Sequence, residues 1–110
     1  MREESAEARP VIVPLPVEID VSNAQAVCSL LCEAVEAGAA VIIADMTETR
    51  FCDSSGFRML LIAHDRAAGA GAQLRVAVAP DSAVVRALGV MSFDRVLRVY
   101  PSLGEAVAAS

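Results

Sequence analysis

Apolar and polar positions along the chain form short strand-like runs, separated by stretches with helical spacing. The unbroken apolar run at residues 41–44 has the length of a strand, and such runs are typical of strands buried on both faces of a parallel sheet. Because proline cannot donate to a strand ladder, Pro14 and Pro16 predict an edge strand, a bent strand or a strand followed by a loop. The remaining strand-like segments are residues 11–13, 17–20, 74–78 and 96–100.

Helical periodicity predicts two longer helices between these strands. The first carries one apolar stripe and ends at Gly38, and Ser22 with Gln25 three positions later predicts a capping box at its start. The second runs from residues 53–56 to about Ala68, where Gly69 and a second glycine follow.

Two shorter helices are predicted nearer the C-terminus. One begins at residues 80–82, and the other opens with a second capping box, formed by Ser102 and Glu105. Arg75 and Arg98 alternate with apolar neighbours and are expected on the solvent side of their strands. Strands that alternate with helices indicate an α/β layer fold with parallel strand pairs and right-handed crossovers.

Composition narrows the class of protein. The chain has 110 residues, 55% of them hydrophobic, and a formal net charge of −5. This length predicts one domain over residues 10–110, preceded by a flexible charged tail over residues 1–9. An acidic chain lacks the basic face that nucleic-acid binding needs, and the longest apolar run, residues 37–44, falls far short of the ~20 residues of a membrane span. We therefore expect neither nucleic acid nor a membrane as a partner.

Lysine and cysteine usage excludes further classes. The chain has no lysine, so it forms no Schiff base and has no phosphate-binding lysine of the kind found in kinases and P-loop proteins. A receiver domain phosphorylated at Asp45 or Asp53 also requires a lysine and is excluded. Three irregularly spaced cysteines suit the reducing cytoplasm better than a disulfide framework.

The segment Asp53-Ser54-Ser55-Gly56 carries the candidate chemistry. It follows a predicted strand and loop and directly precedes a helix with apolar periodicity. Both hydroxyls therefore lie at a helix N-terminus, and a phosphate on either serine is expected to meet the free N–H groups there. The simpler interpretation is that Ser54 or Ser55 is only the N-cap of the helix, and the pattern alone favours it.

The two faces of the helix that follows these serines bear on whether they form a functional site or only an N-cap. Its predicted core face consists of Phe57, Leu60, Leu61, His64 and Ala68. The opposite face has Met59 and Ile62 in line with Ser55 and Arg66, and Arg58 lies beside them. These two apolar residues are either covered by a neighbouring element or form a partner-docking stripe, and the sequence favours neither.

The remaining reactive side chains are expected to be structural. Cys28 and Cys32 are one helical turn apart, but no third ligand has suitable spacing, so we expect buried packing, no metal and no cofactor. Cys52 is either a redox-sensitive thiol or a packed loop residue, and packing is favoured. His64 and Ser55 are separated by about 13.5 Å along one helix and lie on opposite faces, which excludes a direct Ser–His pair.

Over about residues 11–109 the chain resembles a STAS domain, specifically the stand-alone anti-sigma factor antagonist type. Glu18-Ile19-Asp20 followed by Asn23-Ala24 resembles the family's G-E-L-D…A segment. Residues 41–45 and 51–57 resemble its strand–loop–D-S-S-G–helix signature. Further similarities are Leu88-Gly89-Val90, Phe93, and the segment from Val99-Tyr100 to Glu105-Ala106.

This resemblance implies an α/β STAS fold with a mixed, mostly parallel sheet of four or five strands and about four helices. It implies that Ser55 is phosphorylated by the partner, an anti-sigma factor that is an ATP-binding serine kinase. The unmodified antagonist binds that partner, the phosphorylated form binds it poorly, and a metal-dependent serine phosphatase resets the switch. Such a protein regulates sigma-dependent transcription and is not an enzyme, so no catalytic residue is expected.

The resemblance also suggests roles for the residues around Ser55. Asp53 shapes the loop, Gly56 permits close approach, and Phe57 anchors the helix. The other expected neighbours of the phosphosite are Ser54, Asp20 and Asn23. The expected partner-binding residues are Phe57, Arg58, Met59, Ile62 and Arg66.

The chain departs from the family pattern at its first strands. Pro16-Val17 replaces the family's glycine, and the preceding strand is short or absent unless residues 2–9 supply it. An alternative function is a STAS scaffold or transporter-accessory subunit without phosphoregulation. A small hydrolase or nucleotide-binding domain is a second, less favoured alternative.

Overall fold

Four parallel strands form the main sheet of the computed structural model, which describes residues 9–109. The strands lie in the order β1 (Val11–Pro14), β3 (Val41–Met46), β5 (Gln73–Val78) and β6 (Arg98–Tyr100). The central pair, β3 and β5, is in register along its whole length, from Val41 opposite Gln73 to Met46 opposite Val78. The apolar run at 41–44 lies in β3, between two other strands, as its unbroken hydrophobicity predicts.

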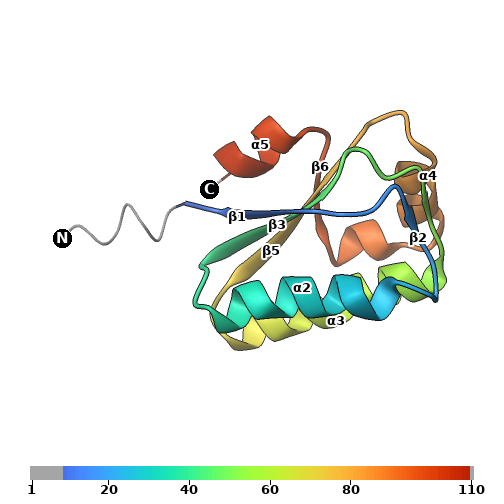
Figure 1. Ribbon diagram of the computed structural model, residues 1–110. Helices are drawn as coiled ribbons and strands as arrows, with labels where there is room; N and C mark the ends of the chain where they lie inside the picture. The colour runs from blue at the N-terminus through green and yellow to red at the C-terminus, as the bar shows by residue number, and fades with distance from the viewer. Residues whose placement is uncertain (1–8, 110) are drawn as a thin grey trace.

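Helices cover both faces of this sheet, as Figure 1 shows. The long helices α2 (Ala24–Glu36) and α3 (Ser54–Gly69) lie side by side on one face, and the short helix α5 (Leu103–Ala108) lies on the other. Two helices on one face are expected when successive parallel strands are joined by right-handed crossovers. Helix α4 (Ala83–Val90) and the 3-10 turn η1 (Phe93–Arg95) connect β5 to β6.

A second, smaller sheet lies beside the start of α3. It pairs β2 (Glu18–Ile19) with β4 (Phe51–Cys52) in parallel, with Glu18 opposite Phe51 and Ile19 opposite Cys52. Ile19 and Cys52 are buried, whereas Glu18 and Phe51 are exposed. The small sheet therefore turns one apolar face towards the core and the other face towards solvent.

The core consists of two clusters, one on each face of the main sheet. The larger one packs α2 and α3 against the sheet, and Phe57 lies within it, fully buried, with its ring 5.6 Å from that of Phe93. The smaller cluster joins Ile43 and Ala77 of the sheet to Ala106 of α5.

The predicted α/β class with a mostly parallel sheet is confirmed, and every strand pair within residues 9–109 is parallel. Ser102 is the N-cap of α5, as predicted, and its Oγ accepts from the Glu105 N–H at 3.0 Å. The capping box predicted at Ser22 is wrong, because α2 begins after Asn23 and the Ser22 hydroxyl donates to Asp20 instead.

The predicted tail over residues 1–9 falls, apart from Arg9, on residues outside the described range. In the part of the chain that the structure describes, no helix combines the length and apolar character needed to cross a membrane.

Arg75 is the main exception to the predicted exposure pattern. The sequence predicts it on the solvent side of β5, but it is only 5% exposed. Its Nη1 donates to the Ala106 carbonyl at 2.8 Å, and its Nε donates to Gln73 Oε1 at 2.6 Å. That carbonyl lies near the C-terminal end of α5, where helix carbonyls have no intrahelical partner. Arg75 therefore fixes α5 on the sheet, whereas Arg98, opposite it on β6, is exposed as predicted.

We predict that Arg75→Met lowers the free energy of unfolding by about 1–3 kcal/mol, because it leaves the Ala106 carbonyl and the Gln73 amide oxygen without their donor. Urea unfolding measures the loss, and hydrogen exchange should be faster in α5 than elsewhere. Arg98→Met is the matched control and is expected to stay within about 0.5 kcal/mol of the wild type. Equal destabilisation by the two variants would contradict the role assigned to Arg75.

Candidate functional site

The candidate site is the first turn of α3, where Asp53 is the N-cap residue. One carboxylate oxygen, Asp53 Oδ1, accepts from the Ser55 N–H at 3.0 Å and from the Gly56 N–H at 3.2 Å. The same oxygen accepts from the Ser55 hydroxyl at 2.5 Å. Asp53 thus satisfies two of the amides that a helix start leaves unpaired, and it orients the Ser55 side chain.

These hydrogen bonds hold the pKa of the Asp53 carboxyl below its ordinary value, and the Ser55 hydroxyl contributes most. Donors that stabilise the charged form of a carboxyl lower its pKa. At neutral pH the site is therefore a serine hydroxyl bound to a carboxylate. The sequence predicts that a phosphate on this serine would meet free amides, but the Ser55 and Gly56 amides already bind Asp53.

The small sheet positions this turn. The Asp53 N–H donates to the Ile19 carbonyl at 3.0 Å, so the β2–β4 pairing continues to the N-cap itself. On the β2 side, the Asp20 N–H donates to Asn23 Oδ1 at 3.0 Å, and Asn23 Nδ2 donates to the Glu18 carbonyl at 2.9 Å. Asp20 and Asn23, predicted as neighbours of the phosphosite, therefore form the turn that continues from the strand beside Asp53.

Gly56 lies where the helix approaches the small sheet most closely. A Cβ at this position would lie 2.6 Å from Cys52 Sγ and 2.7 Å from Ile19 Cγ2, distances that real Cβ atoms do not show. A side chain at residue 56 would therefore push α3 away from β2 and β4. The glycine is required here by close packing and not by an unusual backbone angle.

The two serines differ in environment. Ser54 is exposed, whereas Ser55 is half-buried and its hydroxyl is held by Asp53. Asp53, and neither serine, is the N-cap, so the simpler interpretation of the serines as caps is wrong.

The exposed side of α3 contains part of the predicted partner-binding surface. Arg58, Ile62 and Arg66 are exposed, and Met59 is half-buried against the core. Phe57 is fully buried, so its placement on that surface is wrong, and it instead anchors α3 in the core.

The predicted core face of α3 also needs correction. Ala68 is exposed, whereas Ala63 and Ala67 are buried. Leu61 and His64 are half-buried. The true inward stripe is centred one position away from the predicted one, because α3 packs against both the sheet and α2.

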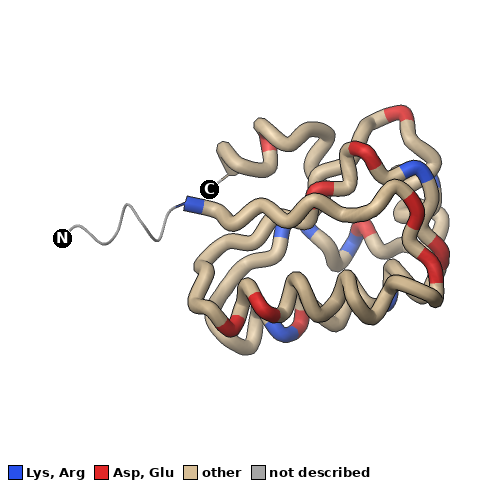
Figure 2. Tube along the Cα trace, viewed as in Figure 1, with Lys and Arg blue, Asp and Glu red and all other residues tan. Residues whose placement is uncertain are grey.

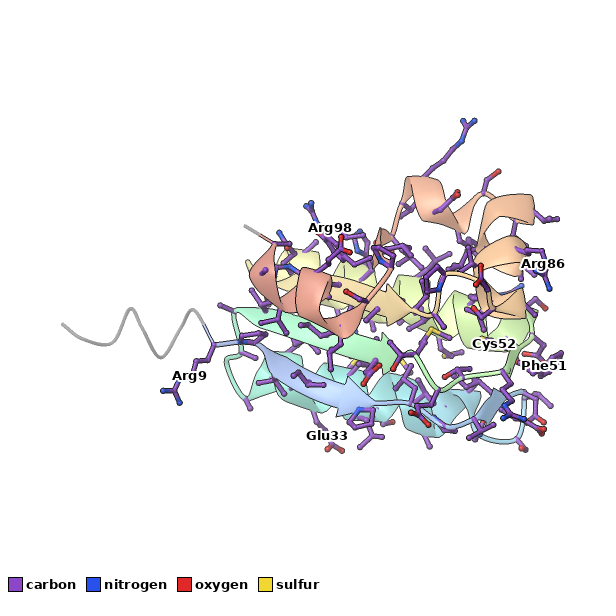
Figure 3. The ribbon with its side chains drawn as sticks, turned by 90° about the horizontal axis from the view of Figure 1, so that it is seen from above. Arg9, Glu33, Phe51, Cys52, Arg86 and Arg98 are labelled. Atoms are coloured by element: carbon purple, nitrogen blue, oxygen red, sulfur yellow. The ribbon has the colours of Figure 1, made fainter. Side chains whose placement is uncertain are left out.

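Two exposed apolar residues near the site were missed by the sequence analysis. Val21 is 80% exposed in the turn after β2, and Phe51 is 51% exposed on the outer face of β4. Figure 3 shows Phe51 at the edge of the molecule, next to Cys52 in β4. The period-two alternation of Phe51 and Cys52 was the available signal, because one of two successive strand residues must face outward.

Cys52 is a packed residue, as favoured from the sequence. Burial, followed by the nearby Asp53 charge, raises the pKa of its thiol to about 12, so the thiolate needed for oxidation or metal binding is scarce at neutral pH. Cys28 and Cys32 are likewise buried, with their Sγ atoms 3.8 Å apart. Within residues 9–109 no group of three or more His, Cys, Asp or Glu side chains is placed to hold a metal ion.

The STAS domain family model matches residues 3–106. The chain belongs to the STAS domain family. No curated protein sequence matches it significantly.

Solved structures show the same fold. This STAS domain superposes on an anti-sigma factor antagonist from Mycobacterium paratuberculosis with a TM-score of 0.79 and 21% identity, covering 89% of this chain and 82% of the other. A sulfate transporter family protein from Wolinella succinogenes gives 0.77 and 20%, covering 90% and 82%. The anti-sigma factor antagonist SpoIIAA in its unphosphorylated form gives 0.64 and 20%, covering 89% and 84%. Because the identity to these structures is only 20–21%, the similarity establishes the fold alone.

We predict that Asp53→Asn flattens the pH dependence of stability. Since the folded pKa of Asp53 is lowered, the carboxylate contributes stability above its unfolded value of ~3.9, and that contribution is lost as the pH falls through the folded pKa. The difference between wild type and variant in urea unfolding should therefore shrink from pH 6 to pH 2. Asp65→Asn, on the exposed side of α3, serves as control. A difference that stays constant across this range would contradict the assignment.

We predict that Gly56→Ala lowers the free energy of unfolding by about 1–3 kcal/mol, because the added methyl group overpacks the contact with Ile19 and Cys52. Gly69→Ala is the matched control at the other end of α3, where a Cβ meets nothing within 4 Å. It is expected to be neutral or stabilising by up to about 1 kcal/mol, since alanine favours the helix. Thermal or urea unfolding distinguishes the two, and a neutral Gly56→Ala would refute the packing constraint.

Proposed function

We propose that this STAS domain is an anti-sigma factor antagonist that acts in the cytoplasm and is controlled by phosphorylation of Ser55. The observation that carries the proposal is Ser55, a half-buried residue at the first turn of α3 whose hydroxyl is held by Asp53. The unmodified protein binds an anti-sigma factor that is a serine kinase, and phosphorylation releases it. A metal-dependent serine phosphatase regenerates the binding form.

The hydrogen bonding around Ser55 supports this proposed switch. Esterification removes the hydroxyl hydrogen that binds Asp53 and places a phosphate with about −1.5 to −2 charges beside an ionised carboxylate. Because Asp53 already occupies the first-turn amides, the phosphate is repelled from that position and directed outward. A partner docked over Ser55 would then have to bury this charge.

The surroundings of Ser55 suit contact with a protein. On α3, Arg58, Ile62 and Arg66 continue from the serine along an exposed side. On the small sheet, Phe51 offers an exposed ring. Acidic residues of β2 and the turn after it lie at the same end of the molecule as the start of α3 (Figure 2). An apolar centre with charged surroundings is the usual anatomy of a protein interface, and no enzymatic step is part of the proposal.

A STAS scaffold or transporter-accessory subunit without phosphoregulation is the second candidate. The similarity to a structure from the sulfate transporter family favours it. The two candidates differ in one property, because only the antagonist changes its affinity for a partner when Ser55 is phosphorylated.

The test is phosphorylation by candidate serine-kinase anti-sigma factors with ATP, followed by mapping of the phosphate by mass spectrometry. We predict that the phosphate is found on Ser55 and that Ser55→Ala abolishes it, whereas Ser54→Ala, at the adjacent exposed hydroxyl, leaves it unchanged. Calorimetry should show that the phosphorylated protein binds the kinase several hundred-fold more weakly, a loss of about 3–4 kcal/mol. Ser55→Asp should weaken binding in the same direction.

Binding that is unaffected by Ser55→Asp, together with a phosphate on another residue, would overturn the switch. Binding to a transporter or scaffold partner that is equally tight before and after treatment with kinase would favour the second candidate.

A further inference from the structure

The main sheet ends on one side at β1, whose one strand partner among residues 9–109 is β3. Figure 3 shows β1 along the outer margin of the sheet. An edge strand presents a row of unpaired N–H and C=O groups, to which a further strand can bond. Val11 and Ile12 are 41% and 42% exposed, so this edge is both apolar and accessible. An edge of this kind favours strand addition, by a second copy or by a partner.

The register of β1 on β3 determines which backbone groups point outward. The Leu15 N–H, directly after β1, donates to the Asp45 carbonyl of β3 at 2.9 Å. Because the backbone groups of successive strand residues alternate in direction, Val11 and Val13 face β3 in the same way as Leu15. The backbone of the residues between them faces outward, and these residues are Pro10, Ile12 and Pro14.

Proline removes the donors from this outward-facing row. Pro10 and Pro14 have no N–H, and their rings occupy the place of the missing hydrogen. Ile12 is the one outward-facing residue of β1 that has an N–H. Pro14 does not weaken the pairing of β1 with β3, because its nitrogen points away from β3.

Pairing with a second copy illustrates what the two prolines exclude. In an antiparallel pairing centred on Ile12, each Ile12 would face the Ile12 of the other copy and exchange both hydrogen bonds with it. The next bonded pair would place Pro10 opposite Pro14, and neither residue has an N–H to donate. The carbonyls of both prolines would then lose water without gaining a donor, which costs free energy.

The other strand edges are protected by their shortness. β6, on the opposite side of the main sheet, has three residues, begins with the exposed Arg98 and is followed directly by Pro101. In the small sheet, β2 and β4 have two residues each. Short strands, charged side chains and proline are the features by which edge strands avoid pairing. Of the edge strands that the structure describes, β1 is the longest, with four residues, so blocked donors matter most there.

We propose that Pro10 and Pro14 block strand addition at the β1 edge. The domain therefore does not self-associate through its main sheet, and it takes no partner as an added strand. Partners are left to bind through side-chain surfaces. This property does not depend on Ser55 or on its phosphorylation.

The test is the double variant Pro10→Thr/Pro14→Thr, which restores the missing N–H donors with a residue that favours strands. Hydrogen exchange of the Ile12 amide, followed by NMR as the protein concentration is raised, reports strand addition at this edge, and sedimentation equilibrium measures the mass. In the wild type we expect an Ile12 exchange rate that does not depend on concentration. In the double variant this exchange should slow by about tenfold or more with concentration, and the mass should rise from 11.5 kDa towards that of a dimer.

A single variant and a control accompany the double variant. Pro14→Thr alone restores one donor to each pair of residues 10 and 14 and should give a smaller slowing at Ile12. It keeps the test valid if circular dichroism shows that the double variant does not fold. Pro80→Thr adds an N–H at an exposed position in the turn before α4, away from the strand edges, and should behave like the wild type.

An Ile12 amide that exchanges equally fast in the folded variants and in the wild type would overturn the proposal, because the prolines would then not be what blocks the edge. Exchange at Ile12 that slows with concentration in the wild type would also overturn it, since the edge would then pair despite the prolines.

Discussion

The contact of Gly56 with Ile19 and Cys52 is the constraint on which the candidate site depends. The main sheet and the core fix where α3 lies, but they do not fix the direction of its first turn. The direction of the first turn is set where the two-stranded sheet meets α3. Two contacts set it, the close packing at Gly56 and the hydrogen bond from the Asp53 N–H to the Ile19 carbonyl. A small change in this contact moves the N-cap, and with it the Ser55 hydroxyl.

Under the proposed phosphorylation of Ser55, the same geometry would give Asp53 two opposing roles. As N-cap it stabilises α3 by accepting from two first-turn amides. As a carboxylate it occupies the position that an anion at a helix N-terminus would otherwise take. A phosphate on Ser55 would therefore stay at the surface and would not fold back onto the helix. The proposed effect is on a partner, so the fold of the domain need not change.

Much of the fold was predictable from the sequence because it rests on local patterns. The unbroken run 41–44 predicts a buried parallel strand, and the serine pair predicts the start of α3. The predictions that were wrong concern residues whose positions depend on contacts with other parts of the chain. The burial of Arg75 depends on its contact with Ala106 of α5, 31 residues further along the chain. The start of α2 after Asn23 depends on a turn in which Asn23 donates to the Glu18 carbonyl. Phe57 was assigned to two roles, and only the packing of α3 decides that it belongs to the core.

The packing of α3 determines how far the proposed phosphate on Ser55 could act within the domain. Nine residues of helix span about 13.5 Å, whereas the Debye length at physiological ionic strength is about 8 Å. A charge on Ser55 would therefore be largely screened at the C-terminal half of the helix. Mechanical coupling would require α3 to have two arrangements, but Phe57, Leu60 and Ala67 are fully buried along its length and hold it in one. A partner that responds to the proposed modification would therefore have to contact the first turn of α3 itself.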